Sequence, residues 1–266
     1  MNKKIGFIGA GNMGSAIAER LIKSGDFHAS DILITDIDSK KTDKLAKLGA
    51  TICENAEFVA KQADIVVLAV KPYAFKYLLN SISAYTNPLY ISIAAGITID
   101  YIKSFFSQNV RVIRAMPNTP ALIGEGVTVV SYKHPATQQD ESLACGIFEK
   151  VGMVQRMNEE YLDSIVALSG SSPAYVYIMI EAMADAAVSG GIDRNVAYKL
   201  AAQAVAGSAK MVLQTGLHPA VLKDNVCSPG GTTIKAVEML EEKGFRSALI
   251  SAMKECSKRS AQMSGK

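Results

Sequence analysis

Residues 5–14 read IGFIGAGNMG, a short apolar run that leads directly into a glycine-rich segment. Gly9, Gly11 and Gly14 fit the pattern G-x-G-x-x-G, which predicts nucleotide binding only between a strand and a helix. The apolar run predicts the strand, and Ser15–Lys23 predicts an amphipathic helix. Glycine permits the tight turn, the approach of a pyrophosphate and close helix–strand packing, and the N–H groups at the helix start face the anion. The stretch predicts a dinucleotide site; the alternative is a glycine-rich turn that binds no nucleotide.

Similar apolar runs recur through the first 160 residues, and amphipathic segments such as Ser39–Leu48 separate them. The runs are rich in Ile and Val with little polar alternation, which is typical of strands covered on both faces of a parallel sheet. This alternation predicts an α/β fold, a Rossmann-type doubly wound and mostly parallel sheet, over residues 1–160. The predicted strands are Lys4–Ile8, Ile32–Thr35, Ile65–Val70, Leu89–Ala94, Val110–Ala115, Val127–Tyr132 and Met153–Met157, with a helix over Thr137–Lys150.

The pattern changes near residue 160, where strand-like runs end. Residues 161–266 predict an all-helical domain, with helices near 159–168, 173–189, 193–215, 219–226 and 230–262, the last broken at Gly244. Helices 173–189 and 193–215 are apolar around most of their circumference. Small residues line much of the second: Ala197, Ala201, Ala204, Gly207 and Ala209. We interpret these faces as the interface of an obligate homodimer; the alternative is a compact helical bundle within one chain.

The composition excludes several classes of protein. The 266 residues allow about two domains, and 49% hydrophobic with 20% charged residues excludes global disorder. The formal charge is only +3 and no basic stripe is present, so we expect no nucleic-acid partner. Glu181 and Asp185 interrupt the most apolar segment, Pro173–Gly190, which we interpret as a buried helix and not a membrane span.

Cysteine and histidine usage indicates a reducing compartment and no metal. The four cysteines never approach CxxC spacing, which is typical of reduced thiols in a cytoplasmic protein. The three histidines are widely separated, so we expect neither a zinc site nor a histidine-based catalytic triad. The apolar stretch at the N-terminus is too short for a signal peptide.

An acidic residue ends the second predicted strand, at the position expected about 20 residues after the glycine pattern. The Asp36 carboxylate can accept hydrogen bonds from both ribose hydroxyls of NADH and should repel the 2′-phosphate of NADPH. Lys40 and Lys41 lie one turn into the next helix, where they could reach a phosphate. Asp38 could cap that helix and leave Asp36 free. The choice between NADH and NADPH therefore stays open.

Further candidates follow the other strands, because ligands of such sheets bind beyond the carboxyl ends of the strands. Lys71 could approach the cofactor; the alternative is a solvated lysine before a helix-starting proline. Two prolines make Met116-Pro117-Asn118-Thr119-Pro120 a stiff loop beside the expected nicotinamide position. The residues expected to contact the dinucleotide in this half are Ile8, Gly9, Ala10, Gly11, Asn12, Met13, Gly14, Asp36, Ala69, Val70, Lys71, Pro72, Ala94, Ala95 and Asn118.

Two polar segments stand out in the helical half, each before a predicted helix. They are Ser169-Gly170-Ser171-Ser172-Pro173 and Asp224-Asn225-Val226-Cys227-Ser228-Pro229-Gly230-Gly231-Thr232-Thr233. Small residues with exposed N–H groups before a helix form an anion site, here suited to a carboxylate. The alternative is plain capping by Ser171 or Thr232. Cys227 has no base near it in sequence, so we interpret it as a packed thiol and not a nucleophile.

Taken in order, the segments GFIGAGNMG, AVKP, AAG, MPNTP, SGSSPAY, KDNVCSPGGTT and GFR resemble those of the Δ1-pyrroline-5-carboxylate reductase family. The resemblance extends over essentially the whole chain, and the KDN-x-x-SPGG-x-T block is its most specific part. It implies a Rossmann domain followed by a helical dimerisation domain. It also implies reduction of L-1-pyrroline-5-carboxylate to L-proline by NAD(P)H, the last step of proline biosynthesis. We expect a homodimer that can assemble into a larger ring such as a decamer.

The resemblance also implies roles for individual residues. It places Thr233 on the substrate ring nitrogen as the catalytic residue, Asn225 near the cofactor and Asn55 on the adenosine side. Many members carry small hydroxyl residues after the second strand, so Asp36 is a departure that puts the usual preference for NADPH in question. The implied substrate-binding residues are Glu159, Ser228, Gly230, Gly231, Thr232 and Thr233.

Hydride transfer to a cyclic iminium needs positioning more than a strong general acid, which agrees with the lack of a candidate catalytic histidine. Two other functions are alternatives to this reduction. A β-hydroxyacid dehydrogenase would normally carry a lysine acid/base on its first long C-terminal helix, and Pro173–Gly190 contains no lysine. A dinucleotide sensor without catalysis would have no use for a carboxylate site at Ser228–Thr233. An interlocked dimer would bring that site against a nucleotide domain, so we expect a composite active site.

Overall fold

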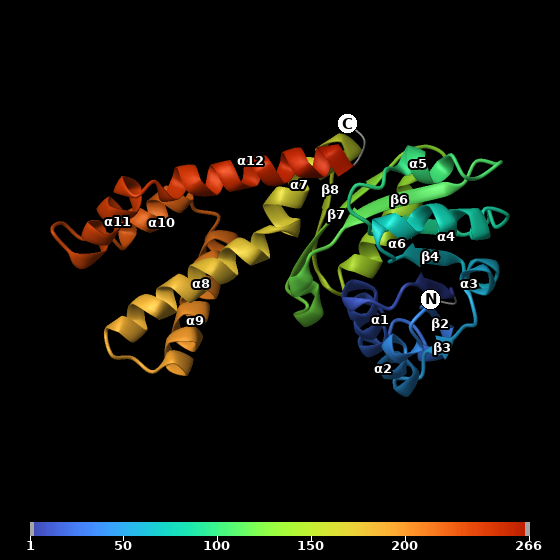
Figure 1. The fold of residues 1–266 in the computed structure, drawn as a ribbon, viewed down its shortest axis with the longest axis horizontal. Helices are drawn as coiled ribbons and strands as arrows, with labels where there is room; N and C mark the ends of the chain where they lie inside the picture. The colour runs from blue at the N-terminus through green and yellow to red at the C-terminus, as the bar shows by residue number, and fades with distance from the viewer. Residues whose placement is uncertain (1–2, 264–266) are drawn as a thin grey trace. The chain divides into compact units, whose positions relative to one another are not determined.

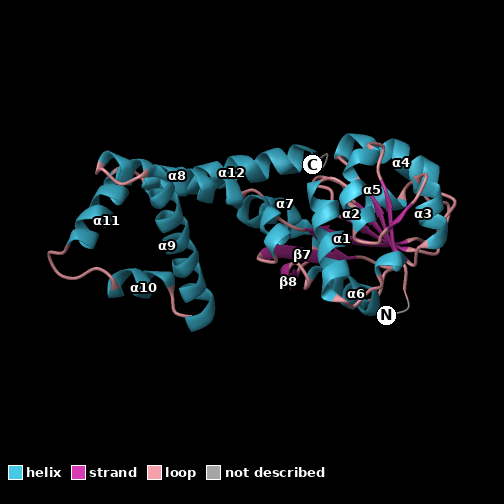
Figure 2. Ribbon diagram, turned by 90° about the horizontal axis from the view of Figure 1, so that it is seen from below, coloured by secondary structure: helices cyan, strands magenta, loops and turns pink. Residues whose placement is uncertain are grey.

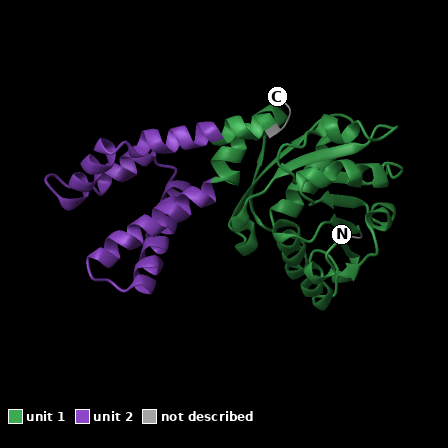
Figure 3. Ribbon diagram, viewed as in Figure 1, with its two compact units in different colours: residues 1–171, 256–266 green, residues 172–255 purple. Residues whose placement is uncertain are grey.

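The computed structural model describes residues 3–263, and the chain divides into two compact units (Figure 3). Unit 1 comprises Met1–Ser171 and Cys256–Lys266, and unit 2 comprises Ser172–Glu255. The chain therefore leaves unit 1 after Ser171 and returns to it at Cys256. These units differ in extent from the expected segments 1–160 and 161–266.

Unit 1 is built around one eight-stranded sheet with the order β3-β2-β1-β4-β5-β6-β7-β8 (Figure 1). Strands β1 to β6 are parallel, β7 is antiparallel to β6, and β8 is parallel to β7. The chain runs outward from β1 to β3 and crosses back to β4 beside β1, which creates a switch point at the carboxyl ends of β1 and β4. This confirms the predicted doubly wound, mostly parallel sheet. The strands are β1 (Ile5–Ile8), β2 (Ile32–Thr35), β3 (Thr51–Ile52), β4 (Ile65–Leu68), β5 (Leu89–Ser92), β6 (Arg111–Met116), β7 (Gly126–Tyr132) and β8 (Gly152–Arg156).

Helices cover both faces of this sheet, and each face has its own hydrophobic cluster (Figure 2). Successive strand residues alternate between the faces. Phe7 and Val67 belong to the cluster beneath α1, α2 and α6, whereas Ile8 and Val66 belong to the cluster beneath α3, α4 and α5. These helices are α1 (Asn12–Ser24), α2 (Asp43–Lys47), α3 (Ala56–Gln62), α4 (Phe75–Ile82), α5 (Ile99–Lys103) and α6 (Gln138–Phe148).

Two strands end earlier at the carboxyl edge of the sheet than the sequence predicts. β4 ends at Leu68 and not at Val70, and β5 ends at Ser92 and not at Ala94. The residues beyond them leave the sheet and line the edge where a ligand would bind. The first helix begins at Asn12, earlier than predicted, because Gly11 already occupies its N-cap position.

Residues 169–173 are not the loop that the sequence predicts. A helical run instead joins η5 (Glu159–Tyr161), α7 (Leu162–Ile165), a π-helical turn (Val166–Gly170) and α8 (Ser172–Ser189). The Ser171 N–H donates to the Val166 carbonyl over 2.7 Å, the i→i−5 bond of a π turn. Pro173 is tolerated because it lies in the first turn of α8, where N–H groups need no partner within that helix.

The start of the helical half belongs to unit 1 because it packs on the sheet. Leu162 of α7 forms a hydrophobic cluster with Met116 of β6. From the other end of the chain, the Ser260 hydroxyl donates to the Asp163 carboxylate over 3.2 Å. The compact units therefore divide after Ser171 and not at the expected boundary between 160 and 161.

Unit 2 consists of helices, and small residues line its inner contact. Helices α8 and α9 pack against each other, with Ala184, Ala197 and Ala201 buried. The long helix predicted over 230–262 breaks at Gly244, which has φ +73°, as the sequence predicts. The remaining helices are α9 (Arg194–Thr215), α10 (Pro219–Asn225), α11 (Thr232–Glu242) and α12 (Phe245–Met263), of which the last ends in unit 1.

Many apolar side chains of unit 2 are exposed in the single chain, among them Tyr177, Ile178, Leu200 and Leu213. The interpretation of Pro173–Gly190 as a buried helix is therefore wrong for the single chain, because Ala184 alone is buried in α8. The helical run Glu159–Ser189 is long and apolar enough to cross a membrane by length and composition only, with a hydropathy of 1.2 and 11% of that window buried. Exposed apolar surface of this kind indicates an interaction site.

A row of buried polar residues crosses three neighbouring strands of the sheet of unit 1. Ser92, Arg114 and Ser131 are register partners on β5, β6 and β7, and all three are buried. Arg114 Nη1 lies 3.4 Å from Glu159 Oε1, and Arg114 Nη2 lies 3.9 Å from Asp163 Oδ1. A buried guanidinium is tolerated only with carboxylates close by, so this charge holds the η5–α7 segment on the sheet.

Removing the buried cation should destabilise the protein strongly. Arg114→Met removes the guanidinium from beside the buried Glu159 and Asp163 carboxylates, so we expect the free energy of unfolding to fall by about 3–5 kcal/mol. Urea denaturation measures this change. Lys150→Met is the control, because Lys150 pairs with Asp26 where both side chains are exposed, and it should leave the denaturation midpoint nearly unchanged. Equal shifts in the two variants would contradict the role of burial.

Candidate functional site

The glycine loop lies between β1 and α1, as predicted. Gly9 has φ +105°, a conformation that side chains rarely adopt, and its N–H donates to the Thr35 carbonyl over 2.8 Å. A β-carbon on Gly14 would lie 2.4 Å from the Gly9 carbonyl oxygen, so the helix packs too closely for a side chain there. A β-carbon on Gly11 would meet nothing within 4 Å. This open space lies at the first N–H groups of α1, where a pyrophosphate would bind.

Asp36 holds the glycine loop in place. Its carboxylate accepts hydrogen bonds from the Ala10 N–H over 2.7 Å and from the Asp38 N–H over 2.9 Å. Lys41 Nζ lies 3.5 Å from the same carboxylate, whose side chain is only 8% exposed. Asp38 caps the next turn by accepting from the Lys40 N–H over 3.2 Å. Asp38 is therefore the cap that the sequence allows, but Asp36 is not left free, since both its oxygens bind backbone.

The segments after β4 and β5 continue the same edge of the sheet. The Ala69 N–H donates to the Ile8 carbonyl over 2.9 Å, and the Ile93 N–H donates to the Leu68 carbonyl over 3.2 Å. The Lys71 side chain is exposed and precedes a 3-10 turn that begins at the next residue. The structure thus gathers one part of the predicted cofactor set at this edge: Ile8, Gly9, Ala10, Gly11, Asn12, Met13, Gly14, Asp36, Ala69, Val70, Lys71, Pro72, Ala94 and Ala95.

Two predicted cofactor residues already have partners within the protein. The Asn55 side-chain oxygen accepts from the Phe58 N–H over 2.8 Å and caps α3, which leaves its amide group for a ligand. Asn118 is buried, and its side-chain oxygen accepts from the Val127 N–H over 2.8 Å. Its amide nitrogen donates to the Ser169 carbonyl over 2.9 Å. Asn118 therefore binds two other segments of unit 1 through its own side chain.

In unit 2, the loop Ser228–Gly231 makes a tight turn before α11. Gly230 has φ +68°, and the Gly231 N–H donates to the Ser228 carbonyl over 3.0 Å. A β-carbon on Gly231 would lie 2.3 Å from the Ser228 hydroxyl and 3.1 Å from the Ser228 carbonyl oxygen, so a side chain there would require the serine to move. Gly231 is the N-cap of α11, and no side chain caps that helix. The alternative of plain capping by Thr232 is therefore not what the structure shows.

The residues around this turn are accessible in the single chain. Ser228, Thr232, Thr233 and Asn225 are exposed, and the thiol residue Cys227 is partly buried. The first N–H groups of a helix have no partner within it. The start of α11 therefore offers backbone donors and the exposed hydroxyl groups of Thr232 and Thr233. This set suits a carboxylate beside a polar ring atom.

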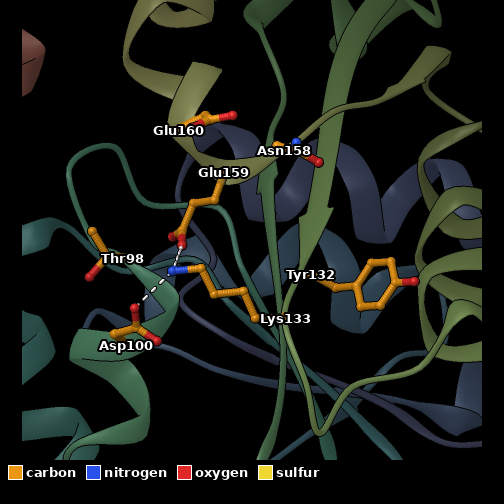
Figure 4. Close-up of a pocket in the computed structure, with 7 residues that line it drawn as sticks. All are labelled: Thr98, Asp100, Tyr132, Lys133, Asn158, Glu159 and Glu160. Carbon is orange, nitrogen blue, oxygen red and sulfur yellow. Dashed lines mark hydrogen bonds and ion pairs between the residues drawn. The ribbon is translucent and has the colours of Figure 1, made fainter.

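Glu159 lies in unit 1, beside a cavity of about 490 Å³ (Figure 4). Its carboxylate accepts from the Ile99 N–H over 2.8 Å and lies 2.8 Å from Lys133 Nζ. The bond to Asp100, followed by the bond to Glu159, raises the pKa of Lys133, and the bond to Lys133 lowers the pKa of Asp100. Glu159 therefore pairs with Lys133 as well as with Arg114, a role that the resemblance does not imply. The cavity is lined by Thr98, Asp100, Tyr132, Lys133, Asn158, Glu159 and Glu160.

Sequence reasoning missed the two cations of this charge cluster. Arg114 carried a signal, because it is a charged residue inside the apolar run Val110–Ala115. Lys133 carried none, since its partner Asp100 lies 33 residues away. Among residues 3–263, no group of three or more His, Cys, Asp or Glu side chains could hold a metal ion.

Comparison with known proteins decides the family. A family model described as pyrroline-5-carboxylate reductase dimerisation matches residues 159–263, and one described as NADP oxidoreductase coenzyme F420-dependent matches residues 4–96. The pyrroline-5-carboxylate reductase of Escherichia coli (strain K12) is 49% identical over 270 residues, which covers 99% of each chain. The chain belongs to the pyrroline-5-carboxylate reductase family. The resemblance read from the motifs is thereby confirmed.

Other pyrroline-5-carboxylate reductases agree with this assignment. The enzyme of Arabidopsis thaliana is 40% identical over 265 residues, covering 98% of this chain and 95% of the relative. A crystal structure of Plasmodium falciparum pyrroline carboxylate reductase with NADP bound superposes with a TM-score of 0.91 at 31% identity. It covers 99% of this chain and 98% of that chain, so the order of a Rossmann domain followed by a helical dimerisation domain is confirmed.

Two glycines of the loop should respond differently to the same substitution. Gly14→Ala forces a β-carbon against the Gly9 carbonyl, so we expect the free energy of unfolding to fall by about 1–3 kcal/mol. Gly11→Ala meets open space and should cost about 1 kcal/mol or less. It should nevertheless weaken dinucleotide binding about tenfold, because the methyl group occupies the path of the pyrophosphate. Urea denaturation and fluorescence titration with NADPH measure both effects. Unchanged affinity in a folded Gly11→Ala protein would place the pyrophosphate elsewhere.

Proposed function

We propose that this chain reduces the C=N bond of L-1-pyrroline-5-carboxylate to give L-proline, with NADPH or NADH as hydride donor. Its full-length similarity to pyrroline-5-carboxylate reductases carries the proposal. The glycine loop supplies a dinucleotide site in unit 1. The uncapped start of α11 supplies a carboxylate site in unit 2.

The chemistry divides between the cofactor and the protein. The nicotinamide supplies the hydride when it is bound. The N–H groups at Gly231 to Thr233 hold the substrate carboxylate, and Thr233 Oγ1 accepts a hydrogen bond from the protonated ring nitrogen. A cyclic iminium is already activated, so the protein needs to position its carbon and does not need a strong general acid. Gly230 and Ser228 shape the turn that presents these groups, and Asn225 lies before it.

The dinucleotide site accepts both cofactors. The Asp36 carboxylate accepts ribose hydroxyls of NADH from a position that already binds the glycine loop. Lys41, 3.5 Å from Asp36, offers a positive charge for the 2′-phosphate of NADPH and offsets the repulsion from the carboxylate. Asn55 contributes its amide group on the adenosine side, and Lys71 lies at the edge of the site.

The protein works as a homodimer in the cytoplasm, with a larger ring such as a decamer as a further level of assembly. The apolar side chains that α8 and α9 expose in the single chain become buried in the dimer. At about 25 cal/mol per Å² of apolar area, several hundred Å² per subunit suffices for stable association.

A direct assay tests the activity. The purified protein is mixed with L-1-pyrroline-5-carboxylate and NADPH or NADH, and loss of nicotinamide absorbance is followed together with formation of proline. We expect turnover with the cyclic imine and none when it is omitted. A folded protein that binds the dinucleotide but turns over neither cofactor with this substrate would overturn the proposed function.

Thr233→Val keeps the shape of the side chain but removes the hydrogen bond to the ring nitrogen. We expect kcat to fall by about 10- to 1000-fold, the scale observed when one hydrogen bond to the transition state is lost. Dinucleotide affinity should hardly change, because Thr233 is assigned to the substrate. Steady-state kinetics and a fluorescence titration separate the two effects. Wild-type turnover in Thr233→Val would remove Thr233 from the mechanism.

Asp36→Ser should shift cofactor preference toward NADPH. It removes the negative charge near the 2′-phosphate, and we expect the ratio of kcat/KM for the two cofactors to change about tenfold, equivalent to about 1.4 kcal/mol. Asp36→Asn is the matched variant, since it removes the charge but keeps an acceptor for the Ala10 N–H. If the wild type strongly prefers NADPH and Asp36→Ser changes nothing, Lys40 or Lys41 governs the choice.

Ala204→Arg tests the assembly. Ala204 is exposed on α9, so the single chain tolerates the larger side chain, whereas a packed dimer interface does not. We expect loss of the dimer in size-exclusion chromatography with light scattering, and loss of activity with it if the active site is composite. Dinucleotide binding should persist. A monomeric variant with undiminished turnover would exclude a composite active site.

A further inference from the structure

The Asn118 side chain forms its hydrogen bonds with segments outside its own loop. Asn118 occupies the N-cap position of a 3-10 turn, Thr119–Ile123, yet it makes no capping bond to that turn. Its oxygen accepts from the Val127 N–H over 2.8 Å, at the start of β7. Its nitrogen donates to the Ser169 carbonyl over 2.9 Å, 51 residues along the chain, and this contact is buried.

The Ser169 carbonyl needs this donor because of the residue four positions later. In a regular helix it would accept from the N–H of residue 173, but Pro173 has no N–H. The residue is only 8% exposed, so its carbonyl would be left buried and unsatisfied. The π turn Val166–Gly170 presents this carbonyl, and Asn118 satisfies it.

The same turn is where the chain leaves unit 1. Ser171 ends unit 1, and its hydroxyl accepts from the Cys256 thiol over 3.3 Å, at the point where the chain returns. Asn118 itself follows β6, at the carboxyl edge that carries the glycine loop. One side chain therefore joins the loop beside the expected nicotinamide position to the turn that begins the helical domain.

We infer that Asn118 is a positioning residue for hydride transfer and not a ligand of the cofactor. Its amide fixes the exit turn at Ser169 on the sheet, next to the loop of residues 116–120. That loop lies beside the expected nicotinamide position, so a shift of the loop on this turn changes the alignment of the nicotinamide with the imine carbon. Displacements of about 1 Å are enough to slow such a step up to about 100-fold. This inference rests on the proposed function.

The test removes the donor and then satisfies the carbonyl in another way. Asn118→Asp keeps an acceptor for the Val127 N–H but cannot donate to the Ser169 carbonyl. The double variant Asn118→Asp/Pro173→Ala returns a backbone N–H that can donate to that carbonyl. Pro219→Ala is the matched control, because Pro219 also lies in the first turn of a helix. Thermal unfolding, the Kd for NADPH and kcat with L-1-pyrroline-5-carboxylate are measured for each.

We expect kcat of Asn118→Asp to fall between about 10- and 100-fold, with the Kd for NADPH within about twofold of wild type. In the double variant the unfolding temperature should rise again while kcat stays low, and Pro219→Ala should keep wild-type kcat. Recovery of kcat together with stability would reduce Asn118 to a structural role. A Kd that weakens as much as kcat falls would make it a cofactor ligand, and unchanged kcat would exclude both roles.

A substitute variant and the wild-type activity make the outcomes distinguishable. If the aspartate variants do not fold, Asn118→Ser, which adds no charge, carries the same measurements and the same outcomes. Wild-type protein without activity on the imine would refute the proposed function, whereas active wild type with fully active variants would refute only this inference.

Discussion

Close packing of α1 over the end of β1 is the constraint on which the nucleotide edge depends. A β-carbon on Gly14 would lie 2.4 Å from the Gly9 carbonyl oxygen, and one on Gly9 would lie 2.7 Å from the Ala69 carbonyl oxygen. A side chain on Gly14 would push α1 away from the glycine loop and displace the free N–H groups of the helix from the anion site, and one on Gly9 would push the loop away from the segment after β4. Asp36 completes the arrangement, since its carboxylate binds the Ala10 N–H and keeps the loop close to β2.

Buried polar groups perform the corresponding task at the start of the helical half. Arg114 places a positive charge inside the sheet, and Glu159 and Asp163 bring η5 and α7 down onto it. A few residues later, the Asn118 amide donates to the Ser169 carbonyl, which Pro173 leaves without a donor. These contacts are directional, whereas apolar packing is not. They therefore fix the point at which the chain leaves unit 1, in addition to holding this segment on the sheet.

Unit 2 is organised in the opposite way, with small residues inside and large apolar residues outside. Ala184, Ala197 and Ala201 let α8 and α9 approach closely, while side chains such as Tyr177 and Leu213 remain exposed in the single chain. Exposed apolar surface of this kind indicates an interaction site, in agreement with the match of residues 159–263 to a dimerisation domain. No side chain caps the start of α11, so its backbone N–H groups and the nearby hydroxyl groups are available to a ligand.

Local pattern determined the secondary structure, because strand and helix periodicities and glycine positions are properties of neighbouring residues. The sequence therefore predicted the doubly wound sheet and the break at Gly244 correctly. The partners of Asp36, Asn118 and Glu159 were beyond its reach, since they lie 26, 51 and 60 residues away and depend on which strands pair. The prediction of a loop at 169–173 was wrong for the same reason. The Asn118 amide donates to the Ser169 carbonyl, which Pro173 leaves without a donor, and the helical run continues. Tertiary structure alone decided these roles, because a buried polar group must find its partner in space and not along the chain.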